Sequence, residues 1–318
     1  MNKRVYGVLC VRAIMANWNA DFNKSPKQNL MDEYYGSDKA LKYSLRNYWY
    51  SQDENVLMYK TFKEHGNDIA VNSLKERYEN LFLNGEELKK GTSTTEIAKN
   101  IFKCIDVKNF GATVAFSLDK KKGKNLSSDE EGGVKLSVTG AVQIGAGMNK
   151  YKDADEEETN ILSPFSVNDK KNSTLGSVIF MSEAHYVYPF TINPANYKGF
   201  IDLGYTEGYT EDDYRKFKES ALISATTLNT CSKEGCENEL AVFIEVDEDV
   251  VLPNLSQYVT YDKEDGKHVY SLNFEYLIEE LEDRIQNIEI YYNSMDMKVN
   301  HSLKKCKMYD IYTKKEVK

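Results

Sequence analysis

The order in which strand and helix patterns follow one another is the feature that most constrains the fold of this chain. The patterns are a strand at residues 4–14, a helix at 37–50, a helix at 210–226 that begins with a capping box of Thr210 and Asp213, a strand at 240–246, a helix capped by Asn273 and a strand at 288–292. Repeated strand–helix–strand units are typical of α+β folds with a ferredoxin-like core. That core serves many functions, so the pattern predicts a fold class and no activity.

The helix predicted at residues 37–50 separates apolar from basic side chains. Read at 100° per residue, its apolar face holds Leu41, Leu45 and Tyr48, and its basic face holds Lys39, Lys42 and Arg46. Ser37 is a suitable N-cap. We expect a helix that packs on a sheet by its apolar face and offers three cations outward. A solvated charged face on an ordinary surface helix would give the same pattern.

Charge is unevenly distributed along the 318 residues. The net charge is −9, yet residues 1–50 carry eight basic against four acidic side chains, and residues 301–318 carry six against two. The negative net charge argues against indiscriminate nucleic-acid binding, because most of the protein surface would repel phosphates. Basic ends on an acidic body fit a restricted cationic groove, or a subunit whose acidic surface meets the basic surface of a neighbour.

The middle of the chain alternates between ordered insertions and polar loops. We expect mostly helix at 57–104, strand at 106–118, a charged loop at 119–133, strand at 134–144, a long polar loop at 151–177 and strand at 178–192. The strands on either side of the charged loop would form a hairpin. A loop as long as 151–177 inside a compact domain is either functional or disordered.

The sequence indicates no metal site and no cofactor. Its five cysteines are scattered and odd in number, which indicates reduced thiols. The four histidines, His65, His185, His268 and His301, lie far apart without the spacing of metal ligands. No apolar run approaches the roughly 20 residues needed to span a bilayer. Since the N-terminal alternation is that of a strand rather than a signal peptide, we expect a cytoplasmic protein without a membrane partner.

Five separated blocks resemble the Cas-seven (Cas7) family, the backbone subunits of the type I CRISPR surveillance complex, Cascade. The blocks are residues 17–21 after the first strand, 37–48, 106–112, 139–143, and the helix from 210 followed by Cys231, Ser232 and Lys233. Their order and spacing are most similar to the type I-B branch. In the first block Trp18 and Ala20 stand where the family usually has Pro and Gly, and in the second Ala40 and Tyr43 stand where it usually has Arg.

The resemblance implies a single elaborated domain over residues 1–318, likened to a hand. Its palm would be a modified RNA-recognition motif, with a helical fingers insertion and a β-hairpin thumb. The implied divisions are a palm of 1–56, 105–150 and 178–300, fingers at 57–104, a thumb at 151–177 and a basic C-terminal tail at 301–318. Leu162 or Phe165 would be the wedge with which the thumb flips out a base of the guide RNA.

The resemblance also implies a non-catalytic scaffold that repeats along a CRISPR guide RNA (crRNA). The residues expected to contact guide phosphates are Lys39, Lys42, Arg46 and Lys233, and those expected to bond phosphate or ribose are Asn17, Asn19, Gln143 and Ser232. Base pairing between guide and target DNA would then read the sequence. The implied partners are crRNA, the target DNA strand, further copies of the chain, the large, cap and guide-processing subunits of Cascade, and a recruited helicase-nuclease.

Other interpretations stay open. Relatives in type III complexes cut RNA with an acidic residue in the loop after the first strand, where Asp21 or Asp32 could hold a divalent metal. A stand-alone RNA-binding protein is a third possibility, and it would not need the two complementary faces that a filament requires. The asparagines of residues 17–19 would, in the plainest interpretation, only satisfy the turn.

Overall fold

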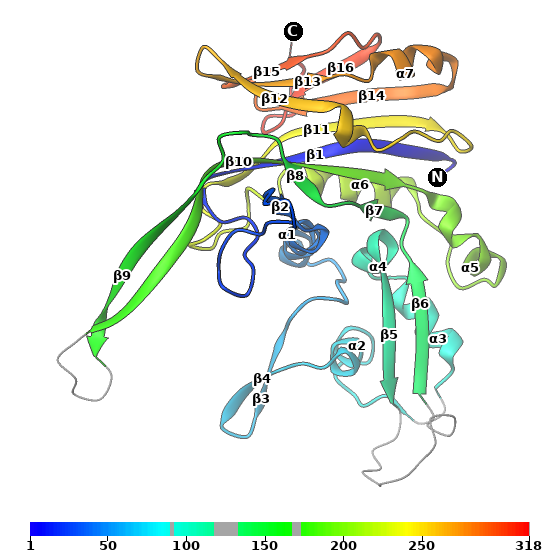
Figure 1. Ribbon diagram of the computed structural model, residues 1–318. Helices are drawn as coiled ribbons and strands as arrows, with labels where there is room; N and C mark the ends of the chain where they lie inside the picture. Colours follow the sequence, from blue (N-terminus) through cyan, green and yellow to red (C-terminus); the bar gives the residue numbers. More distant parts are fainter. Residues whose placement is uncertain (90–91, 118–132, 167–172, 318) are drawn as a thin grey trace. The chain divides into compact units, whose positions relative to one another are not determined.

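The computed structural model of the chain describes residues 1–89, 92–117, 133–166 and 173–317. The chain divides into two compact units that interleave in sequence. Unit 1 comprises residues 1–3, 46–143 and 192–220, and unit 2 comprises residues 4–45, 144–191 and 221–318. Both units mix helices and strands (Figure 1). Within the described ranges, no helix is long and apolar enough to cross a membrane.

Unit 2 is built on a large sheet with the strand order β16-β14-β11-β1-β10-β8-β2. These strands are β1 (Lys3–Ala16), β2 (Tyr35–Gly36), β8 (Gly147–Asn149), β10 (Ser173–Ile192), β11 (Cys236–Asp247), β14 (Ile285–Tyr292) and β16 (Cys306–Asp310). The strands predicted at 4–14, 240–246 and 288–292 are confirmed. Residues 5–11 of β1 are all buried, as expected of a strand covered on both faces.

A smaller sheet in unit 2 packs on one face of the large one. Its strands run in the order β12 (Val259–Glu264), β13 (Lys267–Leu272) and β15 (Met297–Asn300). The short helices of this region are η2 (Leu255–Tyr258), α7 (Glu275–Glu280) and η3 (Glu282–Arg284). Buried side chains of β11, β14 and β13 form one apolar core, which includes Val242, Ile244, Ile290, Tyr270 and Leu272.

The cap predicted at Asn273 is wrong. Helix α7 begins at Glu275, and Phe274 occupies its cap position without a side-chain hydrogen bond. Asn273 instead follows the last residue of β13 (Lys267–Leu272). Its backbone N–H donates to the carbonyl of Tyr258 at 2.9 Å.

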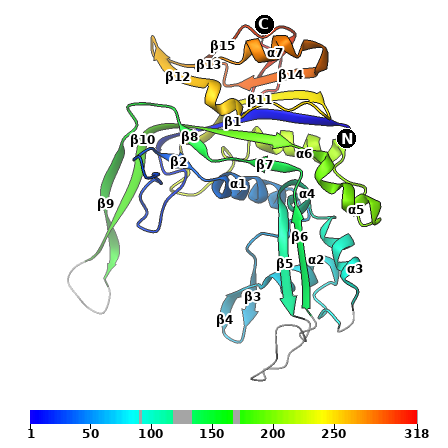
Figure 2. The same ribbon diagram turned by 45° about the vertical axis from the view of Figure 1, so that its right-hand side comes forward.

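A long hairpin formed by β9 (Glu156–Ser166) and β10 extends from the large sheet of unit 2 (Figures 1 and 2). The register runs from Ser173 opposite Ser166 to Met181 opposite Glu156. The prediction of a loop at 151–177 is therefore wrong for most of its length. Consecutive exposed glutamates at 156–158 give β9 no alternation of apolar and polar side chains, so the strand had no sequence signal.

Unit 1 holds most of the helices and two hairpins. Its elements are β3 (Phe62–His65), β4 (Asp68–Val71), α2 (Leu74–Phe82), α3 (Thr94–Ile101), α4 (Ile105–Phe110), β5 (Gly111–Ser117), β6 (Gly133–Thr139), η1 (Pro194–Tyr197), α5 (Lys198–Asp202) and most of α6 (Glu211–Ala221). β7 (Val142–Ile144) lies at the boundary between the units. The hairpin predicted around the charged loop is confirmed as β5–β6, while residues 119–132 of that loop lie outside the described residues.

Two predictions within unit 1 need correction and one is confirmed. Residues 62–71 form the β3–β4 hairpin, not the helix expected there. The strand expected from 106 begins at Gly111, because residues 105–110 form α4. The capping box at Thr210 is present: the Asp213 N–H donates to Thr210 Oγ1, and the Asp213 carboxylate accepts from the Thr210 N–H.

Helix α1 (Asp38–Ser51) begins in unit 2 and ends in unit 1. Ser37 caps it through a 3.3 Å bond from the Ala40 N–H, and Leu41 and Leu45 are buried as predicted. Arg46, however, does not point outward. Its Nε donates to Asp106 at 3.2 Å, and its side chain is only 17% exposed.

The carboxylate of Asp106 joins three segments of unit 1 through hydrogen bonds. It is fully buried, and besides Arg46 it accepts the backbone N–H groups of Leu57 and Met58, each at 2.8 Å. The Arg46 guanidinium also lies over the ring of Phe110, 5.1 Å from its centroid. One buried acid thus joins the end of α1, the start of α4 and the segment between them.

We expect Asp106→Ala to destabilise the chain by about 3 kcal/mol, because it leaves a cation and two backbone donors without an acceptor. Asp202→Ala is the matched control, since Asp202 pairs with Lys198 on the surface and its loss should cost under about 0.5 kcal/mol. Urea unfolding followed by circular dichroism measures both. Equal effects of the two substitutions would contradict a central role for Asp106.

Candidate nucleic-acid interface

The loop that follows β1 is anchored in unit 2 by Trp18. Its indole N–H donates to the hydroxyl of Tyr188 on β10 at 2.5 Å, and both side chains are buried. The Tyr188 ring lies against Gly36 of β2 and Gly147 of β8, which face each other in register. A Cβ at Gly36 would lie 1.8 Å from the hydroxyl oxygen, and one at Gly147 2.5 Å from the ring. The aromatic pair therefore requires glycine on both neighbouring strands.

Two asparagines of this loop hold its geometry. Asn19 Oδ1 accepts the backbone N–H of Ser37 at 2.7 Å, which ties the loop to the cap of α1. Asn17 is only 3% exposed, and its Nδ2 donates to the carbonyls of Lys24 and Ile179 at 3.0 and 3.1 Å. Its Oδ1 is buried and accepts no hydrogen bond from the described residues. Asn17 thus fixes the loop to β10, and Asn19 fixes it to the helix.

A turn some 200 residues further along the chain meets the same loop. The Asn17 N–H donates to the carbonyl of Ser232 at 2.8 Å, and the Lys233 ammonium donates to the carbonyl of Asn17. Burial lowers the pKa of Lys233. Ser232 itself is exposed. The structure therefore brings together three blocks that the sequence keeps apart: the loop, the start of α1 and this turn.

The basic residues at the start of α1 differ in their exposure. Lys39 is exposed, whereas the Lys42 side chain is 15% exposed and pairs with Asp38 at 3.0 Å. Because the N-terminus of a helix carries a partial positive charge, it adds to the charge of Lys39. The most accessible cation of the predicted basic face is thus next to the capped end of the helix.

The other residues predicted to contact RNA are Gln143, Leu162 and Phe165. Gln143 belongs to β7, is exposed, and donates from Nε2 to the carbonyl of Gly140 at 2.9 Å. Leu162 is 69% exposed on β9, opposite Leu175 of β10. Phe165 lies within β9, but its side chain is outside the described residues.

The acidic residues of the loop also have structural roles. Asp21 Oδ1 accepts the backbone N–H groups of Asn23 and Ser25 at 2.7 and 3.0 Å, and Asp32 occupies a left-handed turn position with φ +58°. Both line a cavity of about 650 Å³ together with Glu156. Neither belongs to a group of three metal-ligating side chains among the described residues.

Comparison with known families now identifies the chain. The family model described as "CRISPR-associated protein Cas7" matches residues 3–279. The chain belongs to the Cas7 family. A solved chain titled "CRISPR RNA-guided surveillance complex, pre-nicking" is similar in fold, with a TM-score of 0.54, 11% identity and 96% of each chain covered. Another, titled "CRISPR RNA-guided surveillance complex", has a TM-score of 0.45 and 13% identity, with 93% of this chain and 95% of that chain covered. No curated protein sequence matches.

Trp18 fills the space against Tyr188 and Gly36 with its indole ring. Sequence reasoning missed this contact, because the partners lie 170 residues apart. The one local signal was the placement of a large aromatic residue among the short side chains of residues 16–21.

The Trp18–Tyr188 hydrogen bond can be measured with a double-mutant cycle. We expect Trp18→Phe and Tyr188→Phe each to cost about 1–3 kcal/mol, because each leaves a buried polar group without its partner. The double variant should cost clearly less than the sum of the two single ones, since no orphaned group remains. Tyr276→Phe, at a 74% exposed position, controls for loss of a hydroxyl. Strict additivity in urea unfolding would contradict the hydrogen bond.

Proposed function

We propose that the chain is a backbone subunit of a type I CRISPR surveillance complex, of the I-B branch, that binds crRNA and repeats along it. Its family membership supports this proposal, as does its likeness in fold to a chain whose title names an RNA-guided surveillance complex. The observation that carries it is the meeting of three family blocks at one surface of unit 2. These are residues 17–21 of the loop after β1, the start of α1 and residues 231–233 of the turn.

We assign the contacts to RNA by side-chain exposure and by the burial of the protein partner. Lys39 is exposed, and the partner of Lys42, Asp38, is 37% exposed, whereas the partner of Arg46, Asp106, is fully buried. Lys39 and Lys42 neutralise guide phosphates, while Asn19, Gln143 and Ser232 donate or accept hydrogen bonds at phosphate or ribose. The buried Asn17 bonds to β10 and Lys233 bonds to the carbonyl of Asn17, so both hold this surface in shape, and Arg46 pairs with the buried Asp106 of unit 1. None of these contacts reads a base edge, which leaves sequence recognition to pairing between the guide and the target DNA strand.

The β9–β10 hairpin is our candidate for the thumb. Its exposed Leu162 is an apolar side chain with no place in the core of unit 2, as a wedge between bases would need. We further propose that the large sheet of unit 2 is the RNA-recognition-motif palm, with a ferredoxin-like core, and that residues 57–104 are the fingers. Copies of the chain and the other Cascade subunits would be its protein partners in the cytoplasm.

We propose no catalytic role in RNA cleavage. The Asp21 carboxylate is engaged by two backbone donors of its own loop, which suits a structural acid rather than a metal ligand. The competing function is that of a type III-like endoribonuclease, supported by the cavity that Asp21, Asp32 and Glu156 line. In that case magnesium-dependent RNA cleavage would be lost in Asp21→Ala.

Co-expression with a matching guide array and partner subunits tests the function as a whole. We expect a large particle that holds one RNA species of uniform length, measured by size-exclusion mass and recovery of the bound RNA. An RNA-free monomer that degrades added RNA with magnesium, and stops doing so in Asp21→Ala, would overturn the proposal in favour of the nuclease.

The phosphate contacts are tested by Lys39→Glu combined with Lys42→Glu. Since each phosphate contact to a single strand contributes about 0.7 to the slope of log K against log salt, the double variant should lower that slope by about 1.4 and weaken binding. Fluorescence anisotropy with labelled guide RNA over a salt series measures both. Lys298→Glu changes an exposed lysine on β15 and is the control. Equal losses in the control and the double variant would contradict the assignment.

A further inference from the structure

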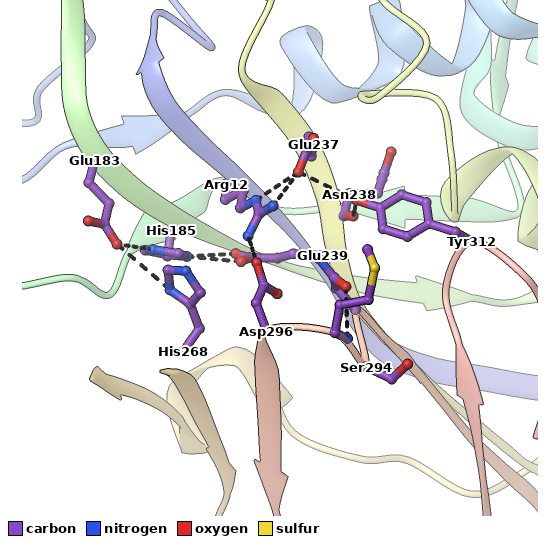
Figure 3. Close-up of polar contacts among 12 residues, drawn as sticks. Arg12, Glu183, His185, Glu237, Asn238, Glu239, His268, Ser294, Asp296 and Tyr312 are labelled. Carbon is purple, nitrogen blue, oxygen red and sulfur yellow. Dashed lines mark hydrogen bonds and ion pairs between the residues drawn. The ribbon is translucent and has the colours of Figure 1, made fainter. Parts of the chain in front are cut away.

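Two histidines that are far apart in sequence meet a glutamate between the large and small sheets of unit 2 (Figure 3). Glu183 and His185 lie on β10, and His268 lies on β13. His185 Nε2 is 2.9 Å from Glu183 Oε1, and His268 Nδ1 is 3.8 Å from the same oxygen. The three ligating atoms all lie within 4.8 Å of one another. Donor atoms of a tetrahedral zinc site are about 3.3 Å apart, so small side-chain shifts would suffice to hold an ion.

Glu239 fixes the ring of His185 from the opposite side. Its fully buried carboxylate lies 2.9 and 3.0 Å from His185 Nδ1 and accepts the Tyr270 hydroxyl at 2.5 Å. Nδ1 must therefore carry a proton, and the lone pair of Nε2 faces Glu183 when the ring is neutral. A lone pair and a carboxylate oxygen repel at 2.9 Å unless a proton or a cation lies between them. A carboxylate behind the second ring nitrogen is the usual support of a metal-bound histidine.

Aromatic rings pack against Glu183, His185 and His268 and leave one side of these three side chains open to solvent. Tyr261 stacks on His185 with ring centroids 3.9 Å apart. The side chains of His268 and Glu183 are 12% and 14% exposed, so an ion and a water ligand can enter from solvent. The Tyr261 hydroxyl forms a hydrogen bond with His268 Nδ1 at 2.5 Å and lies 3.3 Å from Glu183. It can therefore donate to the Glu183 carboxylate when a metal ion binds His268 Nδ1. Lys263 pairs with the other oxygen of Glu183.

We propose that Glu183, His185 and His268 bind one divalent transition metal ion, with Zn²⁺ as the best fit and water in the fourth position. Two imidazoles and one carboxylate with an open position form a donor set that zinc favours. Because the ligands come from β10 and β13, the ion would cross-link the two sheets of unit 2. This inference does not depend on RNA binding.

The metal-free alternative is a proton in place of the ion. Burial alone would lower the pKa of His185, but Glu239 and Glu183 outweigh it and raise that pKa above its ordinary value. Both states use the same side chains, so they are separated by measuring binding of an ion rather than by the contacts themselves.

Cobalt titration of the chelator-treated full-length chain is the test, because Co²⁺ replaces Zn²⁺ and its visible absorption reports four-coordination. We expect saturation at one ion per chain, displacement by Zn²⁺, and a higher melting temperature with Zn²⁺ than without it. His268→Gln should weaken Zn²⁺ binding at least tenfold, and Glu239→Gln should weaken it by about 10–100-fold. His65→Gln, which changes an exposed histidine of unit 1, should leave binding unchanged.

Circular dichroism of each metal-free variant establishes whether it is folded. If a ligand variant is unfolded, Glu183→Gln takes its place in the titration. Two results would overturn the proposal. One is the absence of saturable binding together with equal melting temperatures with and without Zn²⁺, as a proton-bridged group predicts. The other is equal affinity in His268→Gln and the unaltered chain.

Discussion

The packing of Tyr188 against a pair of glycines is the constraint on which the candidate interface depends. Gly36 and Gly147 face each other across two strands, and only their missing side chains let the ring and hydroxyl of Tyr188 reach Trp18. Trp18 in turn holds the loop from which Asn19 reaches Ser37, the cap of α1. The position of the accessible lysine at the start of α1 therefore follows from a packing contact in the interior of unit 2.

In each unit, a buried carboxylate organises elements that are distant in sequence. Asp106 in unit 1 gathers Arg46 and two backbone donors, and Glu239 in unit 2 gathers His185 and Tyr270. A buried charge is costly without such partners, so each network fixes its neighbours in a single arrangement. For Arg46, this means that a cation on the helix face assigned to RNA serves the protein interior instead.

The parts of the fold set by local patterns were predictable, and those set by distant contacts were not. Leu41 and Leu45 revealed the buried face of α1, and the Thr210 capping box revealed the start of α6, because both signals lie within a few residues. The same helical period could not show that Arg46 faces Asp106, 60 residues away. Ligand spacing likewise could not reveal that His185 and His268 meet, because β10 and β13 bring them together only in the folded chain.

The central claim, that copies of this chain repeat along a guide RNA, is tested most directly by native mass spectrometry of particles assembled on guides lengthened in equal steps. The account predicts that the number of copies rises stepwise with guide length, because a contact between copies that does not close into a ring can always add another. A constant number of copies, whatever the length of the guide, would contradict it.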